Sequence, residues 1–370
     1  MNAARTLGWL AAPALGFASA SALADAADVV RQLKAPEGFE ISVWADNVAG
    51  ARSMARGEGG TVFVGTRGAG IVYAVVPPKG DAPARVLKVA SGLNSPNGVA
   101  VRGDALYVAE INRILRYDGI ERQLQKPPAP VVVTEALPSD RHHGWKYIAF
   151  GPDGKLYVPV GAPCNVCESQ DHALILRMNA DGKQREVFAR GVRNTVGFTW
   201  HPGTKELWFT DNGRDWLGDD RPSDELNRAP RMGMHFGFPF CHAGDVPDPE
   251  FGSSGKCSQA TPPAYKLGAH VAALAVKFYG GEMLPAQYRG QMLIVEHGSW
   301  NRSTRVGYQL SWARLDGNRV VAYEPLVTGW NQPESVVGRP VDLLELPDGS
   351  LLVSDDAVGA IYRITYRGAG

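Results

Sequence analysis

The sequence has no excess of charge of either sign, because its 38 Lys and Arg side chains equal its 38 Asp and Glu side chains. A chain without a basic excess gives no reason to expect nucleic acid or an anionic membrane surface as a partner. The apolar run from Leu7 to Phe17 is too short for a membrane span, so no stable membrane insertion is expected. With 44% hydrophobic and 21% charged residues, the composition is that of an ordinary soluble globular protein.

Residues 1–24 have the features of a secretory signal. Arg5 precedes the apolar run, and Ala22, Leu23 and Ala24 fit the small-x-small rule for cleavage before Asp25. We therefore expect a periplasmic or secreted protein whose mature part, residues 25–370, forms one domain.

Cysteine is scarce, with four residues in the chain. An even number in an exported protein suggests disulfides, and of the three connectivities we favour local pairing of Cys164 with Cys167 and of Cys241 with Cys257. Glu168 stands where covalent haem attachment needs a histidine. One CxxC pair also offers too few ligands for structural zinc.

Strong helical periodicity is absent over any stretch of about 10–15 residues, which argues against an α/β fold. Instead, one unit recurs: a turn, a short strand that alternates apolar and polar residues, a polar loop, and a second strand. The six first strands are Thr61–Val64, Ala105–Val108, Leu156–Val158, Glu206–Phe209, Met292–Val295 and Leu351–Val353. The six second strands are Gly70–Tyr73, Ile114–Tyr117, Leu174–Arg177, Glu225–Asn227, Tyr308–Leu310 and Ile361–Arg363.

This spacing predicts an all-β, six-bladed β-propeller, in which sheets arranged radially leave only short, protected edges. The early strand Phe39–Trp44 lacks a unit of its own, so we expect it to complete the blade of the C-terminal repeat and close the ring. The segment Gly213–Ala269 is rich in Gly, Pro, Asp and Cys. We interpret it as long loops over one face.

Two adjacent histidines, His142 and His143, precede the clearest strand signal, the GPDG turn at Gly151–Gly154 followed by Leu156–Val158. A histidine in a loop held by such a scaffold can take a proton near neutral pH. The alternative is a pair of solvated loop histidines. Of the other histidines, only His297 lies in a motif, HGSWNR.

Several motifs, in this order, resemble the soluble pyrroloquinoline quinone (PQQ)-dependent sugar dehydrogenases, and more closely their sorbosone dehydrogenase-like branch. The resemblance runs over nearly the whole chain after the signal. Its motifs are His143 with the GPDG turn, Gly191–Asn194, Thr210–Arg214, Asp224–Asn227, Phe278–Gly281, His297–Arg302, Gly338–Pro340 and Asp355–Asp356.

The resemblance implies a propeller that holds PQQ and Ca²⁺ in a cleft on one face. It implies that His143 is the general base, which takes the proton of the substrate hydroxyl while hydride passes to the quinone. Arg193, Asn194 and Arg339, with Arg302 as a fourth, fall on positions that contact the cofactor, and arginine suits carboxylate recognition. Gly213 and Arg214 carry over as carbonyl ligands of calcium.

The chain also departs from the glucose-oxidising members. His142 replaces an acidic residue beside the base, Ala162 replaces an active-site Asp, and Val341 replaces an Arg that contacts the cofactor. An insertion, Trp216–Asp220, lengthens the loop from Gly213 to Asp224. These changes put glucose as the substrate in doubt and allow altered cofactor binding.

The expected function is therefore oxidation of an aldose or a sugar aldehyde such as sorbosone, with a separate electron acceptor, a cytochrome or a quinone. A homodimer is suggested by analogy alone. One alternative is a metal-dependent lactonase, for which Glu110, Asn212 and Asp355 would supply central ligands. Another is a non-catalytic propeller that binds a glycan or a protein.

Overall fold

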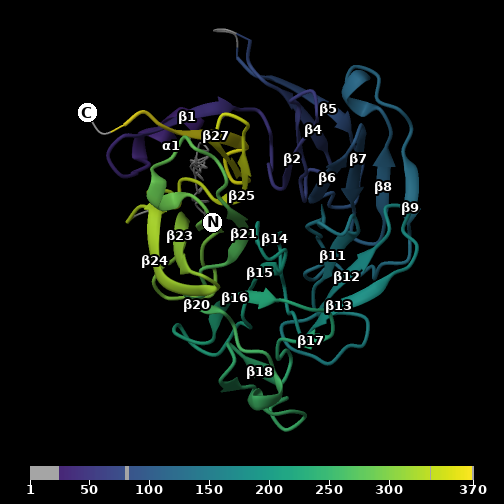
Figure 1. Cartoon of the computed structure of the whole chain (residues 1–370), viewed down its shortest axis with the longest axis vertical. Helices are drawn as coiled ribbons and strands as arrows, with labels where there is room; N and C mark the ends of the chain where they lie inside the picture. Colours follow the sequence, from purple (N-terminus) through teal and green to yellow (C-terminus); the bar gives the residue numbers. More distant parts are fainter. Residues whose placement is uncertain (1–24, 80–82, 334, 369–370) are drawn as a thin grey trace, which may run out of the picture.

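The computed structural model describes residues 25–79, 83–333 and 335–368, so the expected signal at 1–24 lies outside the described residues. Six sheets follow one another around the molecule, each built on four antiparallel strands, and one of them has a fifth strand (Figure 1). The predicted six-bladed propeller is confirmed. Within the described residues, no helix is long and apolar enough to cross a membrane.

The first three blades take their strands in simple chain order. Blade 1 contains β2 (Met54–Arg56), β3 (Val62–Val64), β4 (Val72–Val76) and β5 (Arg85–Ala90). Blade 2 contains β6 (Gly98–Arg102), β7 (Ala105–Ala109), β8 (Ile114–Tyr117) and β9 (Val131–Thr134). Blade 3 contains β10 (Ala149–Phe150), β11 (Leu156–Val160), β12 (Leu174–Met178) and β13 (Glu186–Arg190), with β17 (Met234–His235) added in parallel to β13.

The last three blades include an insertion and the ring closure. Blade 4 contains β14 (Phe198–Trp200), β15 (Leu207–Asp211), β16 (Ser223–Ala229) and β20 (Tyr265–Ala269). Blade 5 contains β21 (Ala273–Phe278), β22 (Met292–Glu296), β23 (Gln309–Asp316) and β24 (Arg319–Val327). Blade 6 contains β25 (Pro340–Glu345), β26 (Leu351–Asp355), β27 (Ala360–Tyr366) and, from the start of the chain, β1 (Phe39–Ala45).

The ring is closed as the sequence predicts. β1 pairs antiparallel with β27, from Phe39 opposite Tyr366 to Ala45 opposite Ile361. The predicted first and second strands of every repeat are the second and third strands of the blades. A short helix not foreseen in the sequence, α1 (Ala26–Gln32), is capped by Asp25 and buries Val29 against blades 5 and 6.

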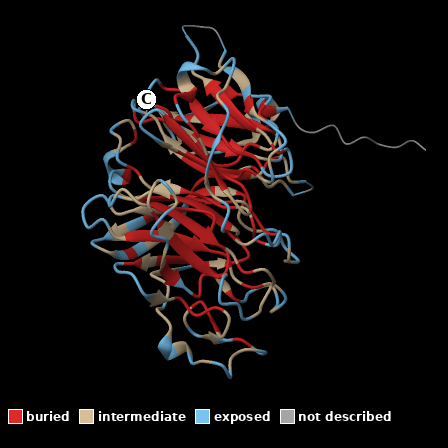
Figure 2. Cartoon of the chain, turned by 90° about the vertical axis from the view of Figure 1, so that its right-hand side faces the viewer, coloured by how far each residue is buried: buried red, intermediate tan, exposed pale blue. Residues whose placement is uncertain are grey.

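The core consists of apolar layers between neighbouring blades, which appear as the buried interior in Figure 2. Alternation along a strand sends successive side chains to opposite faces. Val62 packs with Leu352 of blade 6, whereas Phe63 packs with Leu106 of blade 2. Each blade therefore depends on both neighbours, and the inner strands are held as a rigid frame for the loops that join them.

The segment expected to form loops contains two true blade strands, β16 and β20. Between them lies an excursion with a small ribbon, β18 (Cys241–His242) and β19 (Val246–Pro247), that projects at the lower edge of Figure 1. Three short 3-10 turns complete the elements: η1 (Ile120–Arg122), η2 (Cys257–Gln259) and η3 (Ala286–Tyr288).

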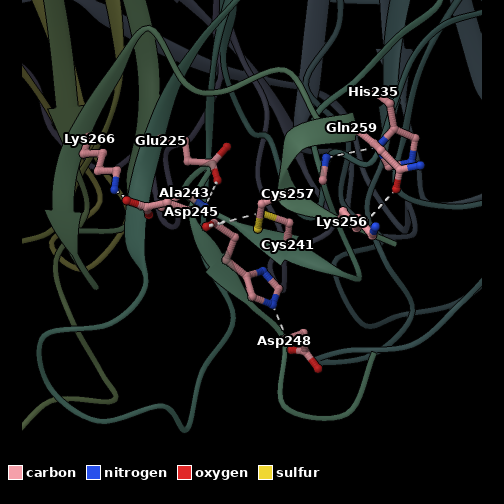
Figure 3. Close-up of a disulfide and its surroundings, with 12 residues drawn as sticks. Glu225, His235, Cys241, Ala243, Asp245, Asp248, Lys256, Cys257, Gln259 and Lys266 are labelled. Carbon is pink, nitrogen blue, oxygen red and sulfur yellow. Dashed lines mark hydrogen bonds and ion pairs between the residues drawn. A yellow bond between two sulfur atoms is a disulfide. The ribbon is translucent and has the colours of Figure 1, made fainter. Parts of the chain in front are cut away.

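Both predicted disulfides are present. Cys164 is bonded to Cys167, and Cys241 is bonded to Cys257. The second ties the ribbon to η2, and close to it the backbone N–H of Ala243 donates to the buried carboxylate of Glu225, as Figure 3 shows. The excursion is thereby anchored to strand β16 of blade 4.

Candidate active site

A cavity of about 230 Å³ is built from loops of blades 1, 3, 4, 5 and 6. Five of the seven predicted site residues line it: His143, Arg193, Asn194, Gly213 and Arg339. The cavity walls also contain Arg52, Arg67, Trp145, Val196, Asn212, Asp215, Asp224, His270, Ala272, Leu274, His297, Gly298 and Trp300. Arg214 and Arg302 lie outside this set of residues.

His143 occupies the loop before β10, with 8% of its surface exposed. Its Nδ1 lies 2.9 Å from the carbonyl oxygen of Ala162. A carbonyl only accepts hydrogen bonds, so Nδ1 carries the proton and Nε2 keeps a lone pair. A Cβ on Gly161 would lie 2.6 Å from the His143 Cβ, so only glycine at 161 lets this loop approach the end of β11 so closely.

The imidazole of His143 stays neutral over a wide pH range. Burial lowers its pKa to about 2, with further contributions from the positive charges of Arg193 and His142. The His142 ring packs against it at 4.0 Å between ring centroids. A neutral, fixed imidazole with a free Nε2 is able to receive a proton from a substrate hydroxyl.

Arg193 is buried and every one of its five guanidinium N–H groups is used by the protein. Nε donates to the Asn165 carbonyl at 2.8 Å, and Nη1 donates to the carbonyls of Asn212 at 3.1 Å and Gly213 at 2.8 Å. Nη2 donates to the Asn165 Oδ1 at 2.9 Å and to Asp215 at 3.2 Å. Arg193 therefore has no donor left for a cofactor carboxylate in this arrangement.

Asn194 differs from Arg193 in this respect. Its backbone N–H donates to Asp211 at 2.6 Å, as does that of Arg193 at 2.8 Å, so a buried carboxylate at the end of β15 fixes this turn. Within the described parts of the chain, the side-chain amide of Asn194 makes no hydrogen bond. It is free to contact a ligand in the cavity.

Arg67 and Arg339, on the cavity wall, keep unused donors. The Arg67 guanidinium lies over the Trp145 ring at 4.0 Å and has no hydrogen bond or ion pair among the described residues. Burial lowers its pKa, as does the nearby charge of Arg52. Arg339 donates through Nε to the His297 carbonyl at 3.3 Å and through Nη2 to the Gly298 carbonyl at 2.9 Å, which leaves Nη1 unused.

Arg52, on the same wall, is anchored by two neighbours, and its Nη2 has no hydrogen-bond partner among the described residues. Its Nε donates to Asn97 Oδ1 at 2.5 Å and its Nη1 pairs with Asp356 at 2.6 Å. The other oxygen of Asp356 lies 2.9 Å from Nε2 of His297. Burial alone would raise the pKa of Asp356, but His297 and Arg52 hold it well below its usual range. Burial lowers the pKa of His297 to about 4.

Sequence reasoning missed Arg52 and Arg67. A weak signal was present for Arg67, which comes three residues after the predicted strand Thr61–Val64. No motif of the resemblance covers them, and only the fold brings this blade 1 loop opposite His143.

The predicted calcium ligands do not form an open site. The predicted ligands are the backbone carbonyls of Gly213 and Arg214, and that of Gly213 accepts from Arg193, as described above. The Arg214 side chain, which is not the predicted ligand, pairs with Asp248 at 2.5 Å. Asp224 lines the cavity, but its oxygens accept from the N–H groups of Gly213 at 2.8 Å and Ala272 at 2.7 Å. Among the described residues, no group of three or more His, Cys, Asp or Glu could hold a metal. As arranged, this loop does not fit calcium, because the Arg193 guanidinium occupies the carbonyls of Asn212 and Gly213.

Arg302 has another role in the structure. It donates through Nη1 to the Asp219 carbonyl, and its Nη2 lies 3.1 Å from Asp220 Oδ1. It therefore joins the HGSWNR loop to the insertion Trp216–Asp220.

The three metal ligands proposed for the lactonase alternative do not come together, since only Asn212 of the three lines the cavity. Glu110 pairs with Arg113, and Asp355 accepts from three backbone N–H groups and from Tyr362.

Known proteins resemble this chain over almost its full length. A protein of Borreliella burgdorferi described as uncharacterized is 32% identical over 358 residues, covering 92% of this chain and 93% of that protein. The calcium structure of a carbohydrate-active enzyme of family AA12 from Trichoderma reesei has a TM-score of 0.79 at 19% identity, covering 91% of this chain and 97% of that one.

The holo form of the PQQ domain of pyranose dehydrogenase from Coprinopsis cinerea has a TM-score of 0.77 at 18% identity, covering 90% of this chain and 97% of that one. Both structures share the propeller fold with this chain. The family described as TrAA12-like matches residues 33–367. This chain belongs to the TrAA12-like family.

Proposed function

We propose that this protein is a PQQ-dependent dehydrogenase that oxidises an aldose or a sugar aldehyde of the sorbosone type. The structural relatives named above include a pyranose dehydrogenase domain in its PQQ-bound form, which supports the cofactor and the sugar class. The observation that carries the proposal is the cavity wall itself. Arg67 and Arg339 direct unused donors to a cavity that also contains a neutral histidine with a free Nε2.

The residues present fit PQQ, a planar molecule with three carboxylates. Arg67 and Arg339 would hold carboxylates, because charge-assisted hydrogen bonds to carboxylates are among the strongest in proteins. The unused amide of Asn194 would add a donor and an acceptor, and the Trp145 ring packs against the Arg67 guanidinium. When bound, the quinone would supply the hydride acceptor for the carbon that is oxidised.

His143 would accept the hydroxyl proton of the sugar on Nε2. The hydrogen bond from Nδ1 to Ala162 holds the ring in the tautomer that this step needs. Proton transfer makes the ring cationic beside Arg193, so the step is favoured only when negative charge enters the cavity. We therefore expect His143 to act as a base only when an anionic cofactor is bound.

The proposal also includes the location of the enzyme, its electron acceptor, calcium, the substrate and the oligomeric state. Export to the periplasm or the medium rests on residues 1–24, and a separate electron acceptor rests on the absence of a haem-attachment motif in the sequence. Calcium stays a prediction that requires Arg193 to release the carbonyls of Asn212 and Gly213. The sorbosone-like substrate and a homodimer also stay predictions.

The test is a titration of the purified metal-free protein with PQQ, with and without calcium, followed by absorbance. Aldoses and sorbosone are then added in turn. Saturable quinone binding and bleaching of the quinone spectrum by a sugar would support the dehydrogenase and rank its substrates. Absence of quinone binding with and without calcium would overturn the proposal and favour a glycan-binding propeller.

A further inference from the structure

Two tryptophans stand exposed together at the cavity. Trp216, in the insertion, is 67% exposed, and Trp300, in the HGSWNR loop, is 66% exposed. Their ring centroids lie 5.5 Å apart at an interplanar angle of 85°. A perpendicular pair covers at most one ring face, so open aromatic faces remain. Trp300 also lines the cavity, which makes the pair continuous with the candidate active site.

The loop that carries Trp216 is held in place from several sides. The backbone N–H of Asp215 donates to Asn165 Oδ1 at 2.8 Å, and His270 Nε2 donates to the Gly218 carbonyl at 2.9 Å. Arg302 binds Asp219 and Asp220, as described above, and the backbone N–H of Ser303 donates to Asp219 Oδ1 at 3.1 Å. The two tryptophans are therefore fixed relative to each other.

The backbone of Trp216 supports the same conclusion. Its φ is +71°, in the left-handed region that a bulky side chain rarely adopts. Such outliers persist where the surrounding contacts determine them, and they gather at ligand sites. Here the contacts hold a large apolar ring in solvent, where it contributes nothing to the core.

We propose that Trp216 and Trp300 form a stacking platform for a second sugar ring, so that the enzyme acts on the end of an oligosaccharide. This inference rests on the proposed function. At about 230 Å³ the cavity is below the roughly 300–1,000 Å³ of typical ligand pockets. A cavity that holds the cofactor therefore leaves the substrate at its mouth, against Trp300.

A pyranose ring matches the chemistry of this platform. Its C–H face packs on an aromatic ring, and its hydroxyls need polar partners, for which the carboxylates of Asp219 and Asp220 follow Trp216 in the same loop. The Asp220 side chain is 87% exposed. A protein partner fits less well, because the other exposed large apolar side chains, Val131, Val132, Met232 and Val321, do not line this cavity. The pair is too small an apolar patch for a stable protein interface.

The test compares binding of glucose, maltotriose and cellotriose to the cofactor-free full chain by isothermal titration calorimetry. We expect at least one trisaccharide to bind about three- to tenfold more tightly than glucose, the range given by one aromatic stack. Trp216→Ala should remove this advantage, Trp216→Tyr should keep most of it, and Met232→Ala, at another exposed apolar site, should leave it unchanged.

With the PQQ-loaded protein, Trp216→Ala should raise KM for the trisaccharide, leave KM for glucose unchanged and leave kcat unchanged. Equal affinity of the wild type and Trp216→Ala for each trisaccharide would overturn the platform. So would a wild-type dimer that Trp216→Ala converts to a monomer in sedimentation equilibrium, since the pair would then be a subunit contact. A trisaccharide advantage in a chain that fails to bind PQQ would keep the platform and overturn the proposed function.

Discussion

Nδ1 of His143 donates a hydrogen bond to the backbone carbonyl of Ala162 across 2.9 Å. The resemblance drawn from the sequence implies that Ala162 replaces an acidic residue of the glucose-oxidising enzymes. A carbonyl fixes the same tautomer that a carboxylate would, but it has no full charge to stabilise an imidazolium. His143 is thus oriented by the backbone, and its basicity depends on what else enters the cavity.

Replacement of His143 by Ala should lower kcat about 100- to 10,000-fold, the range for loss of a general base. Binding of PQQ should be kept, because no donor to a carboxylate is removed. Stopped-flow reduction of the bound quinone by the best sugar, together with a PQQ titration, measures both. His142→Ala is the matched control, since the His142 ring packs on His143 but takes no part in the hydrogen bond to Ala162, and this variant should lose far less turnover. Near-normal turnover of His143→Ala would show that another group takes the proton.

Acid should destabilise the cofactor-free protein through His297. Burial lowers its folded pKa to about 4, below the unfolded value of 6.5. Between these pH values the unfolded chain binds the extra proton, so the free energy of unfolding falls as the pH falls. A shift of this size corresponds to about 3 kcal/mol. Urea unfolding at pH 7 and pH 4.5 measures the loss.

His297→Gln is the control for this pH effect. Its amide can still donate to Asp356 but takes up no proton. The loss of stability on acidification should shrink in this variant, although other groups, His143 among them, keep part of it. An equal loss in wild type and variant would mean that His297 is not the group that titrates.

Arg67 and Arg339 should matter for cofactor retention where Arg302 does not. Arg67→Ala or Arg339→Ala removes a charge-assisted hydrogen bond to a carboxylate, which corresponds to a Kd for PQQ roughly ten- to a hundredfold higher. Arg302→Ala should leave that Kd nearly unchanged, because Arg302 binds the Trp216 loop instead. Fluorescence titration with PQQ compares the three variants. A large loss in Arg302→Ala alone would restore the assignment made from the sequence.

The propeller could be predicted because its signal is local and repeated. The second strands of the blades are almost fully buried and rich in apolar residues, whereas β5 and β9 at the outer edge are partly exposed, although β9 is itself apolar in sequence. These outer strands and the short inner strands such as β10 were not visible in the sequence. α1 was missed because its seven residues owe their helical form to an Asp25 cap and to packing of Val29.

The site was predictable only in part, for a related reason. Motifs locate residues near the cavity, and His143 and Arg339 are among the predicted residues that line it. They do not show which neighbours satisfy a side chain. Arg193 is bound to Asn165 and Asp215, residues far from it in sequence, and this redirects its guanidinium from a cofactor to the protein. Arg67 is the opposite case, because its guanidinium has no hydrogen-bond partner among the described residues, and only the three-dimensional structure shows this.

Arg193 leads to a prediction about calcium. Because its guanidinium already binds the carbonyls of Asn212 and Gly213, the cofactor-free wild type should show no change of Tm with calcium or with a chelator. Binding of a ligand to the folded state alone would raise Tm with concentration. Arg193→Ala frees both carbonyls and the Asp215 carboxylate, so its Tm should be lower and should rise with added calcium. Differential scanning calorimetry of both proteins, with magnesium as the control ion, measures this. A calcium-dependent Tm in the cofactor-free wild type would instead show that Arg193 gives way to the ion.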